Sequence, residues 1–181
     1  MGYLVRKADA FLREWKQNPD RNPLIIKGAR QVGKTETIRT FARENYKNVV
    51  EINFITEPAY KSIIDEGFST DHIIKLISRI DPTKHFVENE TLIFFDEIQD
   101  FPEIATALKF FKENAKYDVI CSGSLLGVQY QRIASISVGY KTDYQMYSMD
   151  FEEFLWAKGY SEEMVLDMLG HMLEGIAFFF F

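Results

Sequence analysis

The sequence predicts an α/β fold built on a parallel sheet, and three observations support this prediction. Short apolar segments with strand character alternate along the chain with longer segments of helical periodicity. The segment at residues 91–96 is almost entirely apolar, which is typical of a strand covered by helices on both faces. Hydrophobic residues make up 46% of the 181 residues, enough for a substantial core. We therefore expect right-handed crossovers and a ligand site beyond the carboxyl ends of the strands.

The first half of the chain contains the clearest local patterns. Apolar residues spaced i, i+3, i+4 and i+7 predict a helix over residues 4–17, and the Asn- and Pro-rich turn after it predicts its end. A short strand is expected at 24–27, followed by a loop at 28–33 and a helix at 35–46. A second strand is expected at 49–54.

The second half repeats this alternation. A helix over residues 69–80 is expected to begin at a capping residue, Ser69, Thr70 or Asp71, and to stop at the Asp-Pro pair that follows. The remaining expected elements are a strand at 91–96, a helix from Pro102 to about Lys116, a strand at 117–122, a fifth strand at 144–149, and helices at 151–157 and 161–173.

Composition excludes several classes of protein. The net charge of −6 argues against a nucleic-acid surface created by bulk charge, although a local basic strip stays open. A single cysteine, Cys121, excludes an internal disulfide framework and fits a reducing compartment. No apolar run approaches the roughly 20 residues of a membrane-spanning helix, so we expect a cytoplasmic protein. The apolar residues 178–181 are expected to be either a truncated end or a native segment packed into the core.

A phosphate-binding loop is predicted between the first strand and the helix after it. The segment from Gly28 to Thr35 fits the pattern G-x-x-x-x-G-K-[ST]. Glycines permit unusual backbone conformations and close approach to phosphate oxygens, while the helix start adds a positive dipole end. An ordinary glycine turn is the alternative, which the position between strand and helix disfavours. The candidate nucleotide-binding residues are Gly28, Ala29, Arg30, Gln31, Val32, Gly33, Lys34, Thr35 and Glu36.

Two carboxylates, Asp96 and Glu97, follow the apolar strand at 91–96. Packing requires no acids at that position, whereas a magnesium nucleotide site does. We expect Asp96, together with the Thr35 hydroxyl, to hold Mg²⁺, and Glu97 to orient the attacking water. Neighbouring residues on an extended segment point to opposite faces, so the two acids can serve different partners. The pair favours hydrolysis over phosphate transfer to an acceptor; a solvated strand end is the alternative.

Supporting polar residues are expected at other strand ends. Ser122 and Ser124 follow the fourth strand and can reach the terminal phosphate or the water, unless they form a plain turn. Asn53 ends the second strand and is expected near Glu97, which it can hold in a resting position; a polar strand end is the equal alternative. Arg132 is a candidate arginine finger, although an isolated arginine is more often a surface residue.

Four segments together resemble a family of prokaryotic AAA-type ATPases. They are residues 21–35, 92–99, 122–127 and 151–156. The resemblance implies a three-layer α/β/α P-loop NTPase sandwich with a parallel five-stranded sheet in the order 5-1-4-3-2. It also implies Walker A at Gly28 to Thr35, Walker B at Asp96 and Glu97, a first-sensor position at Ser122 or Ser124, and adenine as the base.

The same resemblance implies a division of the chain and a function. Residues 1–150 are expected to form the ATPase domain, and residues 151–181 a helical extension that begins a further C-terminal region. Hydrolysis of ATP with magnesium would drive a conformational change in that region or in a protein partner, with a homo-oligomer as one arrangement. The alternatives are a regulatory ATP-binding switch with little turnover, or a DNA-associated motor, which rests on analogy alone.

Overall fold

Five parallel strands form a single sheet in the order β2-β3-β4-β1-β5, which is the predicted order counted from the opposite edge. The structure is a computed structural model that describes residues 3–124 and 139–177. Its elements are α1 (Lys7–Gln17), β1 (Leu24–Lys27), α2 (Lys34–Asn45), β2 (Asn48–Asn53), the 3₁₀ helix η1 (Pro58–Ile64), α3 (Thr70–Ile80), β3 (Thr91–Asp96), the 3₁₀ helices η2 (Ile98–Asp100) and η3 (Pro102–Thr106), α4 (Ala107–Asn114), β4 (Asp118–Gly123), β5 (Thr142–Gln145), α6 (Phe151–Ala157) and α7 (Glu162–Ala177).

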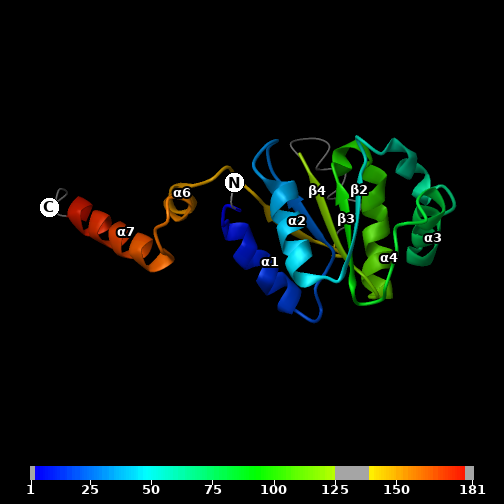
Figure 1. Cartoon of the computed structure of the whole chain (residues 1–181), viewed down its shortest axis with the longest axis horizontal. Coiled ribbons are helices and arrows are strands. Elements are labelled where there is room, and N and C mark those ends of the chain that lie inside the picture. Colours follow the sequence, from blue (N-terminus) through cyan, green and yellow to red (C-terminus); the bar gives the residue numbers. More distant parts are fainter. Residues whose placement is uncertain (1–2, 125–138, 178–181) are drawn as a thin grey trace.

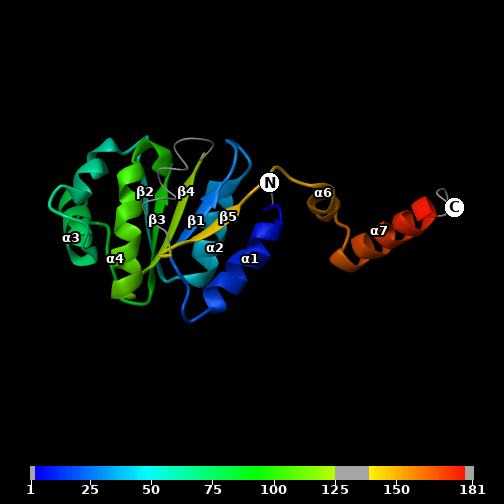
Figure 2. The same cartoon turned by 180° about the vertical axis from the view of Figure 1, so that it is seen from behind.

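Helices cover both faces of the sheet, which confirms the predicted three-layer α/β/α sandwich. α1 and α2 lie on the face turned toward the viewer in Figure 1, and α4 comes to the front in Figure 2. Successive side chains of a strand point to opposite faces, so the almost continuous apolar runs supply both layers of the core. In β3, for example, Ile93 and Phe95 pack on the α3 and α4 side, whereas Leu92 and Phe94 pack on the α1 and α2 side.

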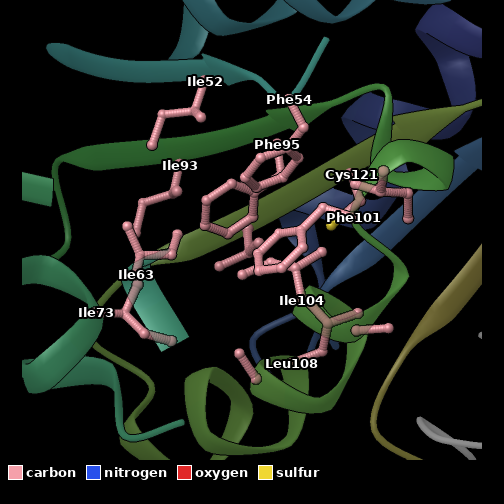
Figure 3. Packing of buried hydrophobic residues seen from close by; sticks show 14 of the residues in the cluster. Ile52, Phe54, Ile63, Ile73, Ile93, Phe95, Phe101, Ile104, Leu108 and Cys121 are labelled. Carbon is pink, nitrogen blue, oxygen red and sulfur yellow. The ribbon is translucent and has the colours of Figure 1, made fainter. Parts of the chain in front are cut away.

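The larger core lies between the sheet and the layer formed by α3, α4 and the 3₁₀ helices. Figure 3 shows side chains of β2 and β3 meeting those of the 3₁₀ helices and α4. Phe54 and Phe95 stack there with ring centroids 5.7 Å apart. Cys121 of β4 is fully buried in this core, and burial raises the pKa of its thiol, so a structural role is the better interpretation of this residue.

The fifth strand was predicted at 144–149 but spans Thr142–Gln145. It pairs with all four residues of β1, from Leu24 to Lys27, and the pairing register decides its length. The Met146 N–H then donates to the Lys27 carbonyl at 2.7 Å, and the chain leaves the sheet. The hydrophobic pattern around residues 144–149 indicated the right region but not the register, which β1 imposes.

Three helices differ from their predicted bounds by three residues or more, and one of them, α7, ends at Ala177 rather than at residue 173. α1 begins at Lys7 rather than near residue 4, because Arg6 is extended and its N–H donates to the Asp9 carboxylate at 2.7 Å. The helix predicted from Pro102 to Lys116 is divided into η3 and α4, and it ends where Ala115 adopts a left-handed conformation with φ of 54°. The 3₁₀ helix η1, between β2 and α3, was not predicted.

α6 and α7 extend away from the sheet, past the N-terminal end of α1, as both views show. α6 begins with a capping box in which the Asp150 carboxylate accepts the Glu153 N–H at 2.9 Å and the Glu153 carboxylate accepts the Asp150 N–H at 3.1 Å. No helix among the described residues combines the length and apolar character needed to cross a membrane. The apolar residues 178–181 lie outside the described residues.

Candidate functional site

The loop between β1 and α2 bends sharply at the carboxyl edge of the sheet. Gly33 stands immediately before α2 with φ of 98°, and Gln31 also has a positive φ of 64°. Gly28 is needed for a different reason: a Cβ there would lie 2.2 Å from the Met146 carbonyl oxygen. The two glycines therefore permit, respectively, a left-handed turn and a close packing of the loop against the chain that leaves β5.

Lys34 is the first residue of α2 and is only 7% exposed. Its ammonium donates to the carbonyl oxygens of Gly28 at 3.1 Å and Ala29 at 2.7 Å, so it lies across the mouth of the loop. Burial lowers the pKa of Lys34, while the nearby carboxylates of Glu97 and Asp96 act in the opposite direction. The loop thus places one cation beside the unpaired N–H groups at the start of α2.

Asp96, at the end of β3, collects hydrogen bonds from several elements. Its Oδ2 accepts the Thr35 hydroxyl of α2 at 3.2 Å and the Asn53 amide of β2 at 3.1 Å. Its Oδ1 accepts the Glu97 N–H at 3.0 Å and the Ser122 hydroxyl of β4. Asp96 is 3% exposed, so these donors compensate for the desolvation of a buried carboxylate. The sheet therefore brings the predicted loop and the predicted acid to one edge.

Glu97 does not continue the strand, which corrects one step of the sequence argument. Its backbone is left-handed, with φ of 57°, and it stands immediately before η2. A turn, rather than the alternation of an extended strand, therefore separates the two carboxylates. Asn53 was expected near Glu97, but its amide donates to Asp96 instead. The side chain that donates to the Glu97 carboxylate is Gln99.

Gln99 and Arg6 are two polar residues of this region that sequence reasoning missed. The Gln99 side chain spans two segments, because its amide donates to Glu97 while its oxygen accepts the Ser124 N–H at 3.1 Å. Arg6 donates to the Val32 carbonyl, inside the loop, at 2.7 Å. Gln99 belongs to the segment 92–99 that carries the family resemblance, but the resemblance gave it no role, and nothing in the sequence connects Arg6 with residue 32.

The predicted loop residues Ala29, Arg30 and Glu36 are exposed. The Glu36 carboxylate accepts hydrogen bonds from Thr40 and Arg43, both at 3.4 Å, one and two turns further along α2. The predicted arginine finger, Arg132, lies outside the described residues, so its position relative to the loop stays a prediction.

A cavity of about 480 Å³ adjoins the loop on the side of α1 and the start of α2. This volume lies within the range of small-molecule sites. The cavity borders the loop at Gly33, and its walls combine apolar, aromatic and charged groups. The other lining residues are Tyr3, Leu4, Arg6, Glu36, Thr37, Arg43 and Met149.

The oxygen donors at the loop suit one kind of metal ion. The Thr35 hydroxyl and the Asp96 carboxylate, 3.2 Å apart, are hard oxygen groups of the type that Mg²⁺ accepts. Among the described residues, no group of three or more His, Cys, Asp or Glu side chains could bind a metal by itself. This donor set fits an ion that takes its other ligands from phosphate oxygens and water, rather than an ion enclosed by protein.

The model of a family described as an AAA domain matches residues 20–155. No curated protein matches the sequence.

Among solved structures, C. elegans PCH-2 is 11% identical with a TM-score of 0.46, covering 80% of this chain and 41% of that chain. Drosophila ORC bound to DNA is 12% identical with a TM-score of 0.47, covering 77% of this chain and 89% of that one. Drosophila ORC bound to AT-rich DNA and Cdc6 is 12% identical with a TM-score of 0.46, covering 91% of this chain and 61% of that one. The chain therefore spans less than two thirds of the first and third of these proteins.

The substitution Gly28→Ala tests the packing of the loop against the chain after β5. The added methyl group would overlap the Met146 carbonyl, so we expect the free energy of unfolding to fall by about 1–3 kcal/mol, as in other overpacked sites. Gly170→Ala is the control, because a Cβ at that exposed position in α7 meets nothing within 4 Å. Urea unfolding measures the free energy of unfolding of both variants and of the wild type. A Gly28→Ala variant as stable as the wild type would contradict the close packing of Gly28 against the Met146 carbonyl.

Proposed function

The chain belongs to the AAA domain family, and on this premise we propose that it binds ATP with magnesium and hydrolyses it to ADP and phosphate. The convergence of Lys34, Thr35 and Asp96 at one edge of the sheet is the observation that supports this function best. A cation at the start of a helix, a hydroxyl and a buried carboxylate are the three groups that a magnesium–triphosphate site requires.

The loop residues 28–36 would hold the phosphates. Backbone N–H groups of the loop and of the first turn of α2 favour anions, and the helix dipole adds to this effect. The Lys34 ammonium, which donates to the carbonyls of Gly28 and Ala29, can exchange these neutral acceptors for phosphate oxygens of the β and γ groups. Because Lys34 is buried, the attraction between its ammonium and a phosphate oxygen would be stronger than in water.

Thr35 and Asp96 would hold the magnesium ion, whose chemistry is to neutralise charge on the phosphate oxygens. Thr35 would use the hydroxyl that now donates to Asp96, while Asp96 would act mostly through a bound water. Ser122 and Asn53 donate to the same carboxylate and so orient it. In this proposal both residues position Asp96, which modifies the role first expected for Asn53.

Glu97 would activate the attacking water. Its carboxylate accepts a proton from the water as the oxygen attacks the γ-phosphorus, and the bond to the β–γ bridging oxygen breaks to leave ADP. Gln99, which donates to Glu97 and accepts from the Ser124 N–H, fixes the orientation of the carboxylate relative to the segment after β4. In this arrangement Ser124 would act indirectly: its N–H holds Gln99, and Gln99 holds Glu97 near the terminal phosphate.

The cavity beside Gly33 would receive the nucleoside part of ATP. A phosphate chain bound in the loop leads directly to this cavity, which has both apolar walls and polar groups. Adenine is the base that the family resemblance implies. Hydrolysis would then drive a conformational change in residues 151–181, in a further region or in a protein partner, within a homo-oligomer or alone. Arg132 stays the proposed arginine finger.

The substitution Lys34→Ala tests the phosphate contact. Loss of a charge-assisted hydrogen bond is worth about 1.5–3 kcal/mol, so ATP affinity should fall roughly ten- to hundredfold. Titration with a fluorescent ATP analogue in the presence of magnesium measures the change. Lys47→Ala, at an exposed position just beyond the C-terminal end of α2 and outside the cavity lining, is the control for altered charge alone. An unchanged affinity would remove Lys34 from the site.

The substitution Glu97→Gln separates hydrolysis from a regulatory switch. The amide keeps the size of the side chain but cannot accept the proton of the water, so ATP should still bind while phosphate release falls at least about a hundredfold. Phosphate release with magnesium, compared with release in EDTA, measures this effect. If wild-type turnover is already negligible with magnesium, the chain is a binding switch and the hydrolytic role is wrong.

The substitution Gln99→Ala tests the orientation of Glu97. We expect turnover to fall about tenfold with unchanged ATP affinity, because second-layer hydrogen bonds orient reacting groups without holding the substrate. Gln17→Ala, the same change at the exposed last residue of α1, should leave both quantities unchanged. Faster turnover in Gln99→Ala would instead show that Gln99 restrains Glu97, and an unchanged rate would assign it no role.

A further inference from the structure

Arg6 lies where three segments meet that are far apart in the sequence. Its guanidinium donates to the Val32 carbonyl of the phosphate-binding loop at 2.7 Å and to the Tyr147 carbonyl after β5 at 2.9 Å. The same group faces the Glu153 carboxylate of α6, with Nε to Oε2 at 3.2 Å. A single side chain therefore touches the loop, the exit of the sheet and the helix beyond it.

Glu153, the partner of Arg6, also contacts more than one element. Its Oε1 accepts the Lys7 N–H at the start of α1 at 2.8 Å, and its Oε2 accepts the Asp150 N–H at the start of α6 at 3.1 Å. The carboxylate thus lies at the N-terminal ends of two helices, where negative charge is favourable. A change in its position would move both helix starts together.

From these contacts we propose that the Arg6–Glu153 pair couples nucleotide occupancy of the loop to the docking of α6 against α1. The pair is a positioning element rather than part of the catalytic groups, and the inference rests on the proposed ATP binding. Both side chains are almost fully buried, with 9% exposed for Arg6 and 6% for Glu153. Buried ion pairs add little net stability over apolar packing, so stability alone does not explain the pair.

The geometry gives the coupling a direct route. Arg6 Nη1 lies 3.3 Å from the position of a Cβ on Gly33, so the guanidinium packs against the turn that surrounds the phosphates. A shift of the Val32 carbonyl as the loop closes on phosphate must stretch or release its bond to Arg6. The same guanidinium also contacts the Tyr147 carbonyl and the Glu153 carboxylate, so a movement of Arg6 would displace Glu153 and with it the start of α6.

Coupling of this kind is reciprocal. If nucleotide changes the docking of α6, then weakening that docking must change nucleotide affinity by the same factor. A pair that merely stabilises the fold would lower the thermal midpoint of the variant without altering nucleotide affinity. This difference separates a coupling role from a structural one.

The experiment compares Glu153→Gln with Glu152→Gln. The glutamine at 153 keeps an acceptor for the capping box but removes the charge that faces Arg6. Glu152 is the matched control, because it lies on the same helix and its ion pair with the Lys7 ammonium is solvent-exposed, so that losing the pair weakens the contact with α1 very little. Hydrogen exchange of residues 151–157 is measured with and without Mg·ATP, and the ATP dissociation constant is measured for each protein.

Four results are distinguished. In the wild type and Glu152→Gln, we expect ATP to change the exchange of residues 151–157; in Glu153→Gln, this change should vanish and the dissociation constant should rise roughly tenfold. ATP binding with equal dissociation constants in all three proteins would overturn the coupling alone. An ATP-dependent exchange change that persists in Glu153→Gln would overturn it as well. No ATP binding to the wild type would overturn the proposed function and this inference with it.

A second variant keeps the test decisive if Glu153→Gln does not fold. Arg6→Lys retains the positive charge beside Glu153, but one ammonium lacks the planar fork that contacts Val32, Tyr147 and Glu153 together. The same loss of ATP-dependent exchange and the same rise in the dissociation constant are expected. Wild-type behaviour of Arg6→Lys would contradict the coupling.

Discussion

The buried carboxylate of Asp96 is the constraint on which the site depends. A carboxyl group that is 3% exposed requires hydrogen-bond partners, and here the donors come from β2, β4, the first turn of α2 and the adjacent backbone. The hydrogen bonds to this one carboxyl group therefore hold the ends of β2, β3 and β4 and the start of α2 close together. The parallel pairing of β2, β3 and β4 makes this convergence possible, because their carboxyl ends share an edge.

The proposed phosphate-binding loop, between β1 and α2, is in contact with the rest of the protein on two sides. On one side, Gly28 allows contact with the chain that leaves β5, and on the other, Arg6 bonds to the Val32 carbonyl. Both contacts lead to the segment between β5 and α6, at Met146 and Tyr147. The loop is thus packed against the segment that links it to α6 in the proposed coupling.

Local patterns predicted most of the helices and strands, while the order of the strands was implied by the family resemblance. The strand at 91–96 and the strand at 24–27 were predicted with their observed bounds, because each is a buried apolar run ended by polar residues. The fifth strand was placed too late, since its bounds depend on pairing with β1 and not on its own hydrophobicity. Asn53 was expected either to hold Glu97 or to be a polar strand end, and its contact with Asp96 was not predicted because the left-handed turn at Glu97 has no signature in the sequence.

The sequence by itself determined which residue types are available for the chemistry proposed for this chain. Glycine spacing, a lysine at a helix start and acids after an apolar strand are local features, and each has a physical meaning wherever it occurs. Only the tertiary structure decided which side chains act together. Gln99 reaches Glu97 because of a turn, and Arg6 reaches Tyr147 across 141 residues of chain. Such contacts depend on how the strands and helices pack, and no local pattern records that packing.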